Sequence, residues 1–156
     1  MEDSTRPLNL EADLLVIGWG KAGKTLARDL ASHGRRVVLV ERDDAMIGGT
    51  CINVACVPTK TLVNLAERRG DRNPDEYLKQ AIASRDALID KLRAANKAML
   101  SGLETVTLVR GEARFAGPRR IQVRSGEETL DITAFAALAE VLQPVAADET
   151  ACPPYH

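Results

Sequence analysis

The chain has 156 residues, of which 45% are hydrophobic and 28% are charged, and a formal net charge of −1. This length supports one domain with a buried core, and the balanced charge gives no basis for binding nucleic acid or an acidic membrane surface. No apolar stretch approaches the roughly 20 residues of a membrane-spanning helix, and the acidic N-terminus lacks the pattern of a signal peptide. We therefore expect a cytoplasmic protein, in which a disulfide is more often catalytic than structural.

The N-terminal part predicts a strand, a glycine-rich turn, a helix and a second strand. Residues 1–11 are polar and aperiodic, so we expect them to form an extension. Residues 13–17 form a continuous apolar run, which is typical of a buried parallel strand. The run leads into the G-x-G-x-x-G of residues 18–23, and a helix is predicted over 24–32. A second buried strand is predicted at 36–40.

Three glycines and one acidic residue in this unit have positions suited to a dinucleotide. Gly18, Gly20 and Gly23 let the backbone turn tightly and approach a pyrophosphate at the positive N-terminus of the helix. Glu41 ends the second strand, where a carboxylate can bind ribose hydroxyl groups. Trp19 is bulky for this turn, and we expect it to shield or crowd the phosphates. A plain glycine-rich turn is the simpler alternative, and the pattern alone fits NAD as well as FAD.

Residues 48–60, GGTCINVACVPTK, contain two cysteines separated by four residues. If Thr50 caps a helix, Cys51 and Cys56 lie on its first turns, where a helix N-terminus stabilises a thiolate. Positions five residues apart point about 140° apart on a helix, so a disulfide requires a distorted first turn. Two unrelated buried cysteines are the simpler alternative. A zinc site is disfavoured, because the remaining candidate ligands show no paired spacing. These candidates are Cys152, His33 and His156.

The remainder of the chain predicts a helical hairpin followed by antiparallel strands. The helix after the cysteines is expected to continue to Ala66. Asn73 and Pro74 provide a capping residue and a first helical residue for a long second helix, which ends near Ser101. Strands are predicted at 105–109, 111–115, 121–123 and 129–132, the last two forming a hairpin. Residues 134–142 contain no glycine and are predicted to form a helix.

The segment from Gly48 to Lys60 resembles the redox-active disulfide motif of the class I pyridine nucleotide-disulfide oxidoreductases, G-G-T-C-x-N-x-G-C-x-P-[ST]-K. Only Ala55 departs from the pattern, at a position where the family has glycine. The family includes glutathione reductase, dihydrolipoamide dehydrogenase and mercuric reductase, and its FAD site precedes the cysteines as the glycine-rich turn does here. The resemblance implies an α/β fold, in which a Rossmann-like FAD-binding domain of parallel sheet and helices carries a small antiparallel β insertion. Among the branches, the chain looks most like the one linked to reactive-chlorine resistance and copper reduction.

The resemblance also implies a route for electrons. In the family, NAD(P)H reduces FAD and the flavin reduces the disulfide. The cysteine matched by Cys51 then attacks the substrate, and the one matched by Cys56 forms a thiolate against the flavin. A lysine near the flavin N5 edge is matched by Lys60, whereas neither His33 nor His156 matches the catalytic histidine that the partner subunit of the homodimer supplies. The residues implied to contact the cofactor are Gly18, Gly20, Gly23, Glu41, Arg42, Gly49, Thr50 and Lys60.

The resemblance covers residues 12–132, which we expect to form a partial FAD-binding domain. The family continues with a nicotinamide domain and a dimerisation domain, whereas residues 133–156 lose the pattern abruptly, so we expect a C-terminally truncated chain with a frame-shifted tail. The expected function is the N-terminal part of an FAD-dependent NAD(P)H oxidoreductase for a disulfide or a metal ion, not catalytically complete by itself. The alternatives are a non-catalytic nucleotide-binding fragment and a small cysteine-based metal-binding protein.

Overall fold

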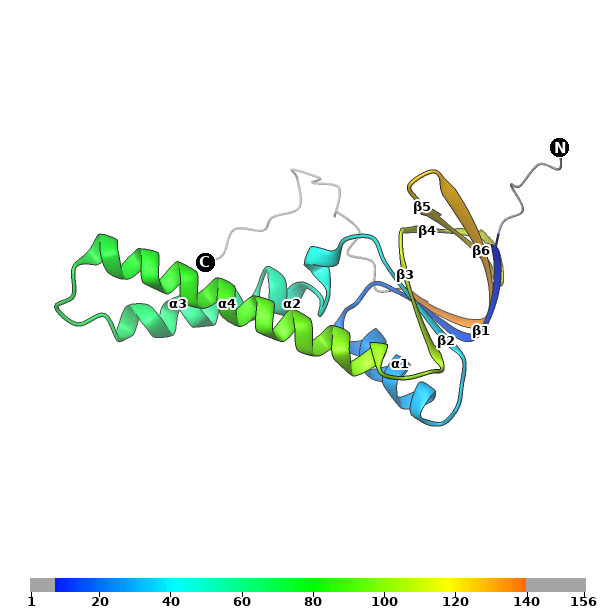
Figure 1. Ribbon diagram of the computed structural model, residues 1–156, viewed down its shortest axis with the longest axis horizontal. Helices are drawn as coiled ribbons and strands as arrows, with labels where there is room; N and C mark the ends of the chain where they lie inside the picture. The colour runs from blue at the N-terminus through cyan, green and yellow to red at the C-terminus, as the bar shows by residue number, and fades with distance from the viewer. Residues whose placement is uncertain (1–7, 140–156) are drawn as a thin grey trace, which may run out of the picture.

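The computed structural model describes residues 8–139. A strand–helix–strand unit comes first, a helical hairpin follows, and four strands complete the described segment (Figure 1). The helices are α1 (Lys21–Ser32), α2 (Thr50–Asn53), α3 (Cys56–Glu67) and α4 (Pro74–Ser101), with a short 3-10 helix η1 (Asp44–Met46). The strands are β1 (Leu8–Ile17), β2 (Val37–Glu41), β3 (Val106–Arg110), β4 (Glu112–Gly117), β5 (Arg120–Ser125) and β6 (Glu128–Ala139).

These six strands form one mixed sheet in the order β3-β2-β1-β6-β5-β4. β1 is parallel to β2 and to β6, with Leu15 opposite Val38 on one side and Ala137 on the other, and β2 is parallel to β3. β5 is antiparallel to both β6 and β4. The predicted Rossmann-like parallel sheet with a small antiparallel part is confirmed. The two parts are continuous, because β6 belongs to both.

Apolar side chains cover both faces of the central strands. On one face, Val16 and Leu39 pack with α1 and with Leu100 at the end of α4. On the other face, Leu15 packs with Ile121 of β5. All five of these side chains are 0% exposed. Burial on both faces explains why β1 and β2 are continuous apolar runs, and each such side chain contributes about 1.5–3 kcal/mol through removal from water.

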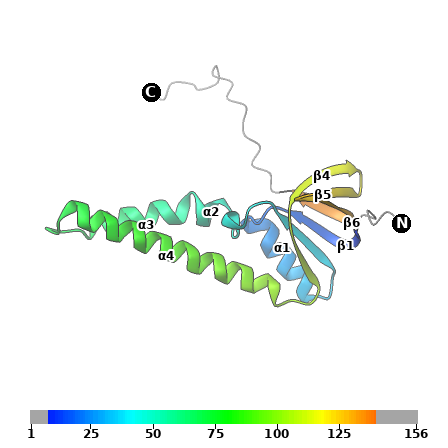
Figure 2. The ribbon, with the colours of Figure 1, turned by 45° about the horizontal axis from the view of Figure 1, so that its top comes forward.

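α3 and α4 form a helical hairpin that projects away from the sheet (Figure 1, Figure 2). Asn73 caps α4 as predicted, because its Oδ1 accepts hydrogen bonds from the backbone N–H groups of Asp75 at 3.0 Å and Glu76 at 3.1 Å. The Tyr77 hydroxyl donates to the Leu65 carbonyl at 2.7 Å and joins the two helices. None of the described helices, the 28-residue α4 included, combines the length and the apolarity of a membrane-spanning segment.

The structure corrects two predictions near the ends of the described segment. β1 begins at Leu8, so residues 8–11 belong to the sheet and not to an extension. The helix predicted over 134–142 is wrong in its described part, because β6 continues to Ala139 and pairs with β1 up to that residue. Pairing with a neighbouring strand here overrides the helix propensity of alanine and leucine. Residues 140–156, with most of the tail that we interpreted as frame-shifted, lie outside the described residues.

Candidate functional site

The glycine-rich turn connects the end of β1 to the start of α1, as predicted. Gly18 has a φ of 97°, a conformation that few L-residues adopt, and its N–H donates to the Val40 carbonyl at 2.8 Å. Gly20 is the N-cap residue of the 12-residue α1, and no side chain caps this end. Gly23 is buried within the helix. The N-terminus of α1 therefore lies at the carboxyl end of the parallel strands, and the positive end of a helix dipole there suits an anion.

Glu41 is bound to this turn from the adjacent strand. Its Oε2 accepts a hydrogen bond from the Trp19 backbone N–H at 3.1 Å. Its Oε1 accepts from the N–H groups of Arg42 at 2.9 Å and Asp43 at 3.2 Å. A carboxylate has about four lone-pair sites, so Glu41 retains capacity for the hydroxyl groups of a ribose.

The Trp19 side chain points into the core, and the prediction that it shields or crowds the phosphates is wrong. It is 4% exposed and packs in the cluster that contains Val16, Leu39 and Leu100. Its Nε1 is buried and has no hydrogen-bond partner among the described residues. The indole thus leaves the outer surface of the turn to backbone groups.

Gly49 places the cysteine segment directly against the glycine-rich turn. It is buried, with φ 83° and ψ 178°. A Cβ atom added to Gly49 would lie 2.8 Å from the Gly20 Cα and 3.0 Å from the Trp19 carbonyl oxygen. Since real Cβ atoms essentially never approach other heavy atoms this closely, only glycine fits. The two motifs that the sequence shows separately are therefore in backbone contact.

The cysteines lie on two helices, not on one. α2 begins at Thr50 with Gly49 as its N-cap, so the prediction that the Thr50 side chain caps the helix is wrong. The helix is interrupted after four residues, and α3 begins at Cys56. The N–H groups of Val54 and Ala55 both donate to the Thr50 carbonyl at 2.9 Å, which makes a wide turn. This interruption is the distortion that a contact between two thiols five residues apart requires.

Cys51 and Cys56 are free, exposed thiols whose side chains are in hydrogen-bond contact. The hydrogen bond from this contact raises the pKa of the Cys51 thiol, and desolvation raises it further. The positive charge of Lys21, the first residue of α1, acts in the opposite direction and lowers this pKa. The four-residue α2 does not produce the net lowering that we expected of a helix N-terminus, and the alternative of two unrelated buried cysteines is wrong.

The Cys56→Ala substitution is expected to lower the pKa of Cys51, because it removes the hydrogen bond that raises it. At a pH of about 8, the thiolate fraction of Cys51 and its rate of alkylation by iodoacetamide should therefore rise. The Lys21→Met substitution should have the opposite effect. Loss of the positive charge should raise the pKa of Cys51 and slow its alkylation. Alkylation rates across pH, assigned by peptide mapping, check both signs. Equal pH profiles in all three proteins would contradict these causes.

Arg42 and Lys60, the two predicted cationic cofactor contacts, lie on different elements. Arg42 follows β2 and lines an open cavity of about 700 Å³, together with Arg124 and Glu112. Arg124 donates to Glu112 at 2.9 Å, and this hydrogen bond holds the pKa of the Glu112 carboxyl below its usual value. Lys60 is exposed on α3, one helical turn after Cys56. The two predicted contacts therefore lie on separate elements, and the cavity at Arg42 is not lined by Lys60.

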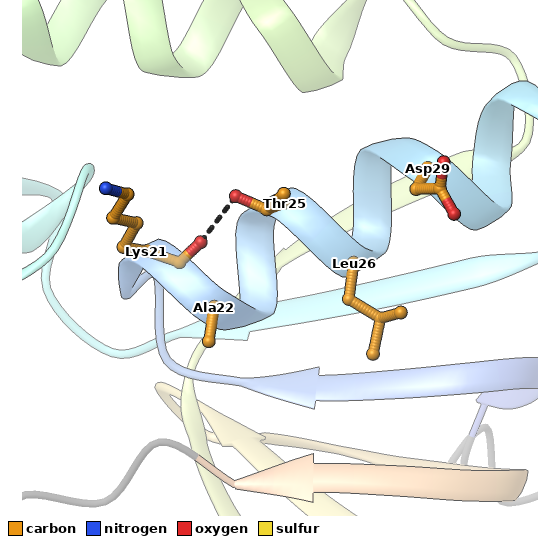
Figure 3. Close-up of a pocket in the computed structure, with 5 residues that line it drawn as sticks. All are labelled: Lys21, Ala22, Thr25, Leu26 and Asp29. Atoms are coloured by element: carbon orange, nitrogen blue, oxygen red, sulfur yellow. Dashed lines mark hydrogen bonds between the residues drawn. The ribbon is translucent and has the colours of Figure 1, made fainter.

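A second cavity of about 560 Å³, mostly apolar, runs along α1 (Figure 3). Figure 3 shows Ala22 and Leu26 on one side of α1, both exposed, while the Lys21 side chain extends from the first turn. The Thr25 hydroxyl donates to the Lys21 carbonyl at 2.7 Å. Lys21 lines one end of this cavity and is also the residue whose positive charge lowers the pKa of Cys51.

The described residues contain no group of three histidine, cysteine, aspartate or glutamate side chains placed to hold a metal ion. His33 is exposed, and its Nδ1 hydrogen-bonds with the Asp29 carbonyl at 2.8 Å. Cys152 and His156, the other candidate zinc ligands, lie outside the described residues. Within the described segment, the metal-binding alternative therefore depends on the two thiols.

Sequence reasoning missed the polar side chains that hold the cysteine segment in place. Asn53 Nδ2 donates to the carbonyls of Ile47 and Gly49, each at 2.9 Å. Arg93 of α4 donates through Nε to Asn53 Oδ1 at 3.2 Å. Asn53 stands inside the cysteine motif and was visible there, whereas nothing in the local sequence around Arg93 indicates this contact.

Residues 12–135 match the family model for pyridine nucleotide-disulphide oxidoreductases. The chain belongs to this family. The resemblance inferred from the cysteine motif is thereby confirmed. The prediction that the chain comes from a family of oxidoreductases is confirmed with it.

Curated relatives agree with this assignment. The chain is 40% identical over 118 residues to the probable pyridine nucleotide-disulfide oxidoreductase RclA of Escherichia coli, which covers 76% of this chain and 25% of RclA. It is 40% identical over 121 residues to the dihydrolipoyl dehydrogenase of Thermus scotoductus, covering 71% of this chain and 26% of the relative. A mercuric reductase of Acidithiobacillus ferrooxidans is 36% identical over 126 residues, and the match covers 72% of this chain and 23% of the relative. The chain therefore spans about a quarter of the length of the curated relatives it matches.

The fold also matches solved structures of this family. The Cu(II) complex of the HOCl-induced flavoprotein disulfide reductase RclA from E. coli superposes with a TM-score of 0.76 at 35% identity. The match covers 86% of this chain and 30% of the RclA chain. The described sheet and helices thus have the arrangement of part of a known flavoprotein.

Proposed function

We propose that the chain is the flavin-binding and thiol-carrying part of an FAD-dependent NAD(P)H oxidoreductase that reduces a disulfide or a soft metal ion. The observation that carries this proposal is the backbone contact between Gly49 and Gly20. The contact joins the dinucleotide turn to the short helix on which Cys51 lies. A dinucleotide bound at the turn and the exposed thiol pair would then lie on adjoining parts of one surface.

The residues present fit FAD. Gly20 and Gly49 meet through backbone atoms with no side chain between them, and α1 begins beside this contact. The N-terminus of this helix suits the pyrophosphate, and Glu41 suits the adenosine ribose. Arg42, Thr50 and Lys60 remain proposed contacts of the same cofactor. When bound, FAD supplies the two-electron chemistry that links a nicotinamide to a thiol pair.

The chain's own residues contribute the thiol chemistry. Cys51 and Cys56 release two electrons and two protons when they pass from the dithiol to the disulfide, and take them up again on reduction. The hydrogen bond with Cys56 raises the pKa of Cys51 and so retains its proton in the dithiol. Once this proton leaves, the Cys51 thiolate is the nucleophile, and Lys21 stabilises its charge.

A disulfide or a soft metal ion is the electron acceptor that we propose. Thiolates favour soft metal ions, and both cysteines are exposed in the described segment. Relatives are named mercuric reductases, and the RclA structure is described as a Cu(II) complex. The metal ion in this proposal is a substrate and not a resident group.

Flavin binding is tested by titrating FAD into the purified chain and measuring free and bound flavin by equilibrium dialysis. We expect saturable binding that the Glu41→Ala substitution weakens about tenfold or more, since one charged hydrogen-bond acceptor is lost. Glu127→Ala, in the exposed turn between β5 and β6, should bind FAD as the unmodified chain does. A folded chain that retains no flavin would refute the proposal and favour the cysteine-based metal-binding alternative.

Electron transfer is then tested on the flavin-loaded, disulfide-oxidised chain. Anaerobic reduction with dithionite should release two titratable thiols, mapped to Cys51 and Cys56, and NAD(P)H consumption with a disulfide or Cu(II) measures turnover. If flavin binds but the mapped disulfide survives reduction of the flavin, the chain is a non-catalytic nucleotide-binding fragment.

A further inference from the structure

A polar frame surrounds the turn that precedes Cys51. We call it the turn clamp and define it by four side chains: Lys24 of α1, Asn53 of α2, and Arg93 and Asn96 of α4. None of the four belongs to the proposed cofactor contacts or to the thiol pair. The clamp therefore acts on the site through the segment 47–49.

Side chains satisfy three consecutive carbonyl groups in this segment. Lys24 Nζ donates to the Gly48 carbonyl at 3.3 Å. Asn53 Nδ2 donates to the carbonyls on either side, those of Ile47 and Gly49. All three of these turn residues are buried, and a buried carbonyl without a partner costs free energy. The Gly49 carbonyl also accepts from the backbone N–H groups of Ile52 and Asn53, so the side-chain donors matter most at Ile47 and Gly48. The two glycines have φ values of 95° and 83°, and these donors bind the turn in this conformation.

Two side chains of α4 hydrogen-bond with the donors Lys24 and Asn53. Asn96 Oδ1 accepts a hydrogen bond from Lys24 Nζ, and Asn96 Nδ2 donates to the Leu92 carbonyl at 2.7 Å. Arg93 reaches Asn53 in the same way, one helical turn along. The Lys24–Asn96 bond joins residues 72 positions apart, so it sets where α1, the turn and α4 meet.

We propose that Lys24 and Asn96 are positioning residues for the Cys51–Cys56 pair, a role that rests on the redox function proposed above. Gly49 is the N-cap residue of α2, so fixing the Gly48 carbonyl fixes the first turn of α2 and the place of Cys51 opposite Cys56. Disulfide geometry tolerates little variation. When the turn is fixed, the effective concentration of the Cys51 thiol near the Cys56 thiol is high. Loss of the bonds that fix the turn would lower this effective concentration.

The test is the equilibrium of the full chain with glutathione redox buffers. The two thiols are oxidised to the Cys51–Cys56 disulfide while one glutathione disulfide is reduced to two glutathione molecules. We expect Lys24→Met and Asn96→Leu each to lower this equilibrium constant about tenfold, the size associated with loss of one buried hydrogen-bond partner. Because Lys24→Met removes the bond to Asn96 together with the bond to the Gly48 carbonyl, the double variant should fall no further than Lys24→Met alone. Lys97→Met, an exposed lysine one residue from Asn96, should keep the unmodified constant.

Circular dichroism establishes that each variant is folded, and peptide mapping assigns the disulfide. If Lys24→Met does not fold, Asn96→Leu, which leaves the lysine in place, carries the test alone. Unchanged constants in folded variants, or additive losses in the double variant, overturn the positioning role while leaving the redox function intact. An unmodified chain that forms no Cys51–Cys56 disulfide in any buffer instead overturns the redox function and this role with it.

Discussion

The Gly49→Ala substitution is expected to lower the free energy of unfolding by about 2–5 kcal/mol and to abolish FAD binding. Two separate costs add here. The backbone at φ 83° and ψ 178° is essentially restricted to glycine, and the new Cβ would lie 2.8 Å from the Gly20 Cα. A backbone atom cannot rotate away from the contact, so the turn or α2 must move. Urea denaturation and FAD titration measure the two effects.

Gly34→Ala is the matched control for this substitution. Gly34 follows α1 with a φ of 77°, and its N–H donates to the Ala31 carbonyl at 3.0 Å. An added Cβ would meet nothing within 4 Å, so the substitution costs only the left-handed conformation, about 1–2 kcal/mol. FAD binding should be unchanged. If Gly49→Ala and Gly34→Ala have equal effects on both measurements, the contact between the two glycine motifs has no role.

Leu100→Ala is expected to destabilise the chain by about 2–5 kcal/mol, the range for deleting a fully buried leucine side chain. Leu100 is 0% exposed and packs with Val16 and Leu39 in the core beneath α1. It lies at the end of α4, the helix that also carries Arg93 and Asn96 to the turn clamp. We therefore expect the unfolding midpoint in urea to fall and the glutathione equilibrium to shift in the same variant.

Leu78→Ala provides the control on the same helix. This side chain is 55% exposed, so its removal should change the free energy of unfolding by no more than about 0.5 kcal/mol. The thiol equilibrium should also stay at the unmodified value, because Leu78 lies near the start of α4, far along the helix from Asn96. Similar losses at the two leucines would mean that α4 is not anchored through its C-terminal end.

Much of the local structure was predictable, because its causes lie within a few residues. The apolar run before Gly18 defines β1, and Asn73 with Pro74 defines the start of α4. The cysteine motif likewise identified the family. The contact of Gly49 with Gly20 and the bond of Lys24 with Asn96 were not predictable, since they join residues brought together only by packing of separate elements.

The wrong predictions share a physical origin. The composition of 134–139 favours a helix, but an unpaired edge of β1 is adjacent, and pairing decides the outcome. Trp19 was placed among the phosphates by its position in a loop motif, whereas its large apolar surface is buried in the core. Thr50 has the residue type of an N-cap, yet Gly49 occupies that position because only glycine fits against Gly20.

The pairing of β1 with β6 has a consequence for synthesis of the protein. Leu15 lies opposite Ala137, so the central pair of the sheet joins positions separated by about 120 residues, and closure of so long a loop is slow. On the ribosome, β1 and β2 emerge early, but one edge of β1 waits roughly 6–24 s for β6 at ordinary translation rates. Throughout that interval the nascent chain presents an apolar strand edge, the kind of surface that chaperones bind. Folding of the described sheet therefore requires that β6 has been made.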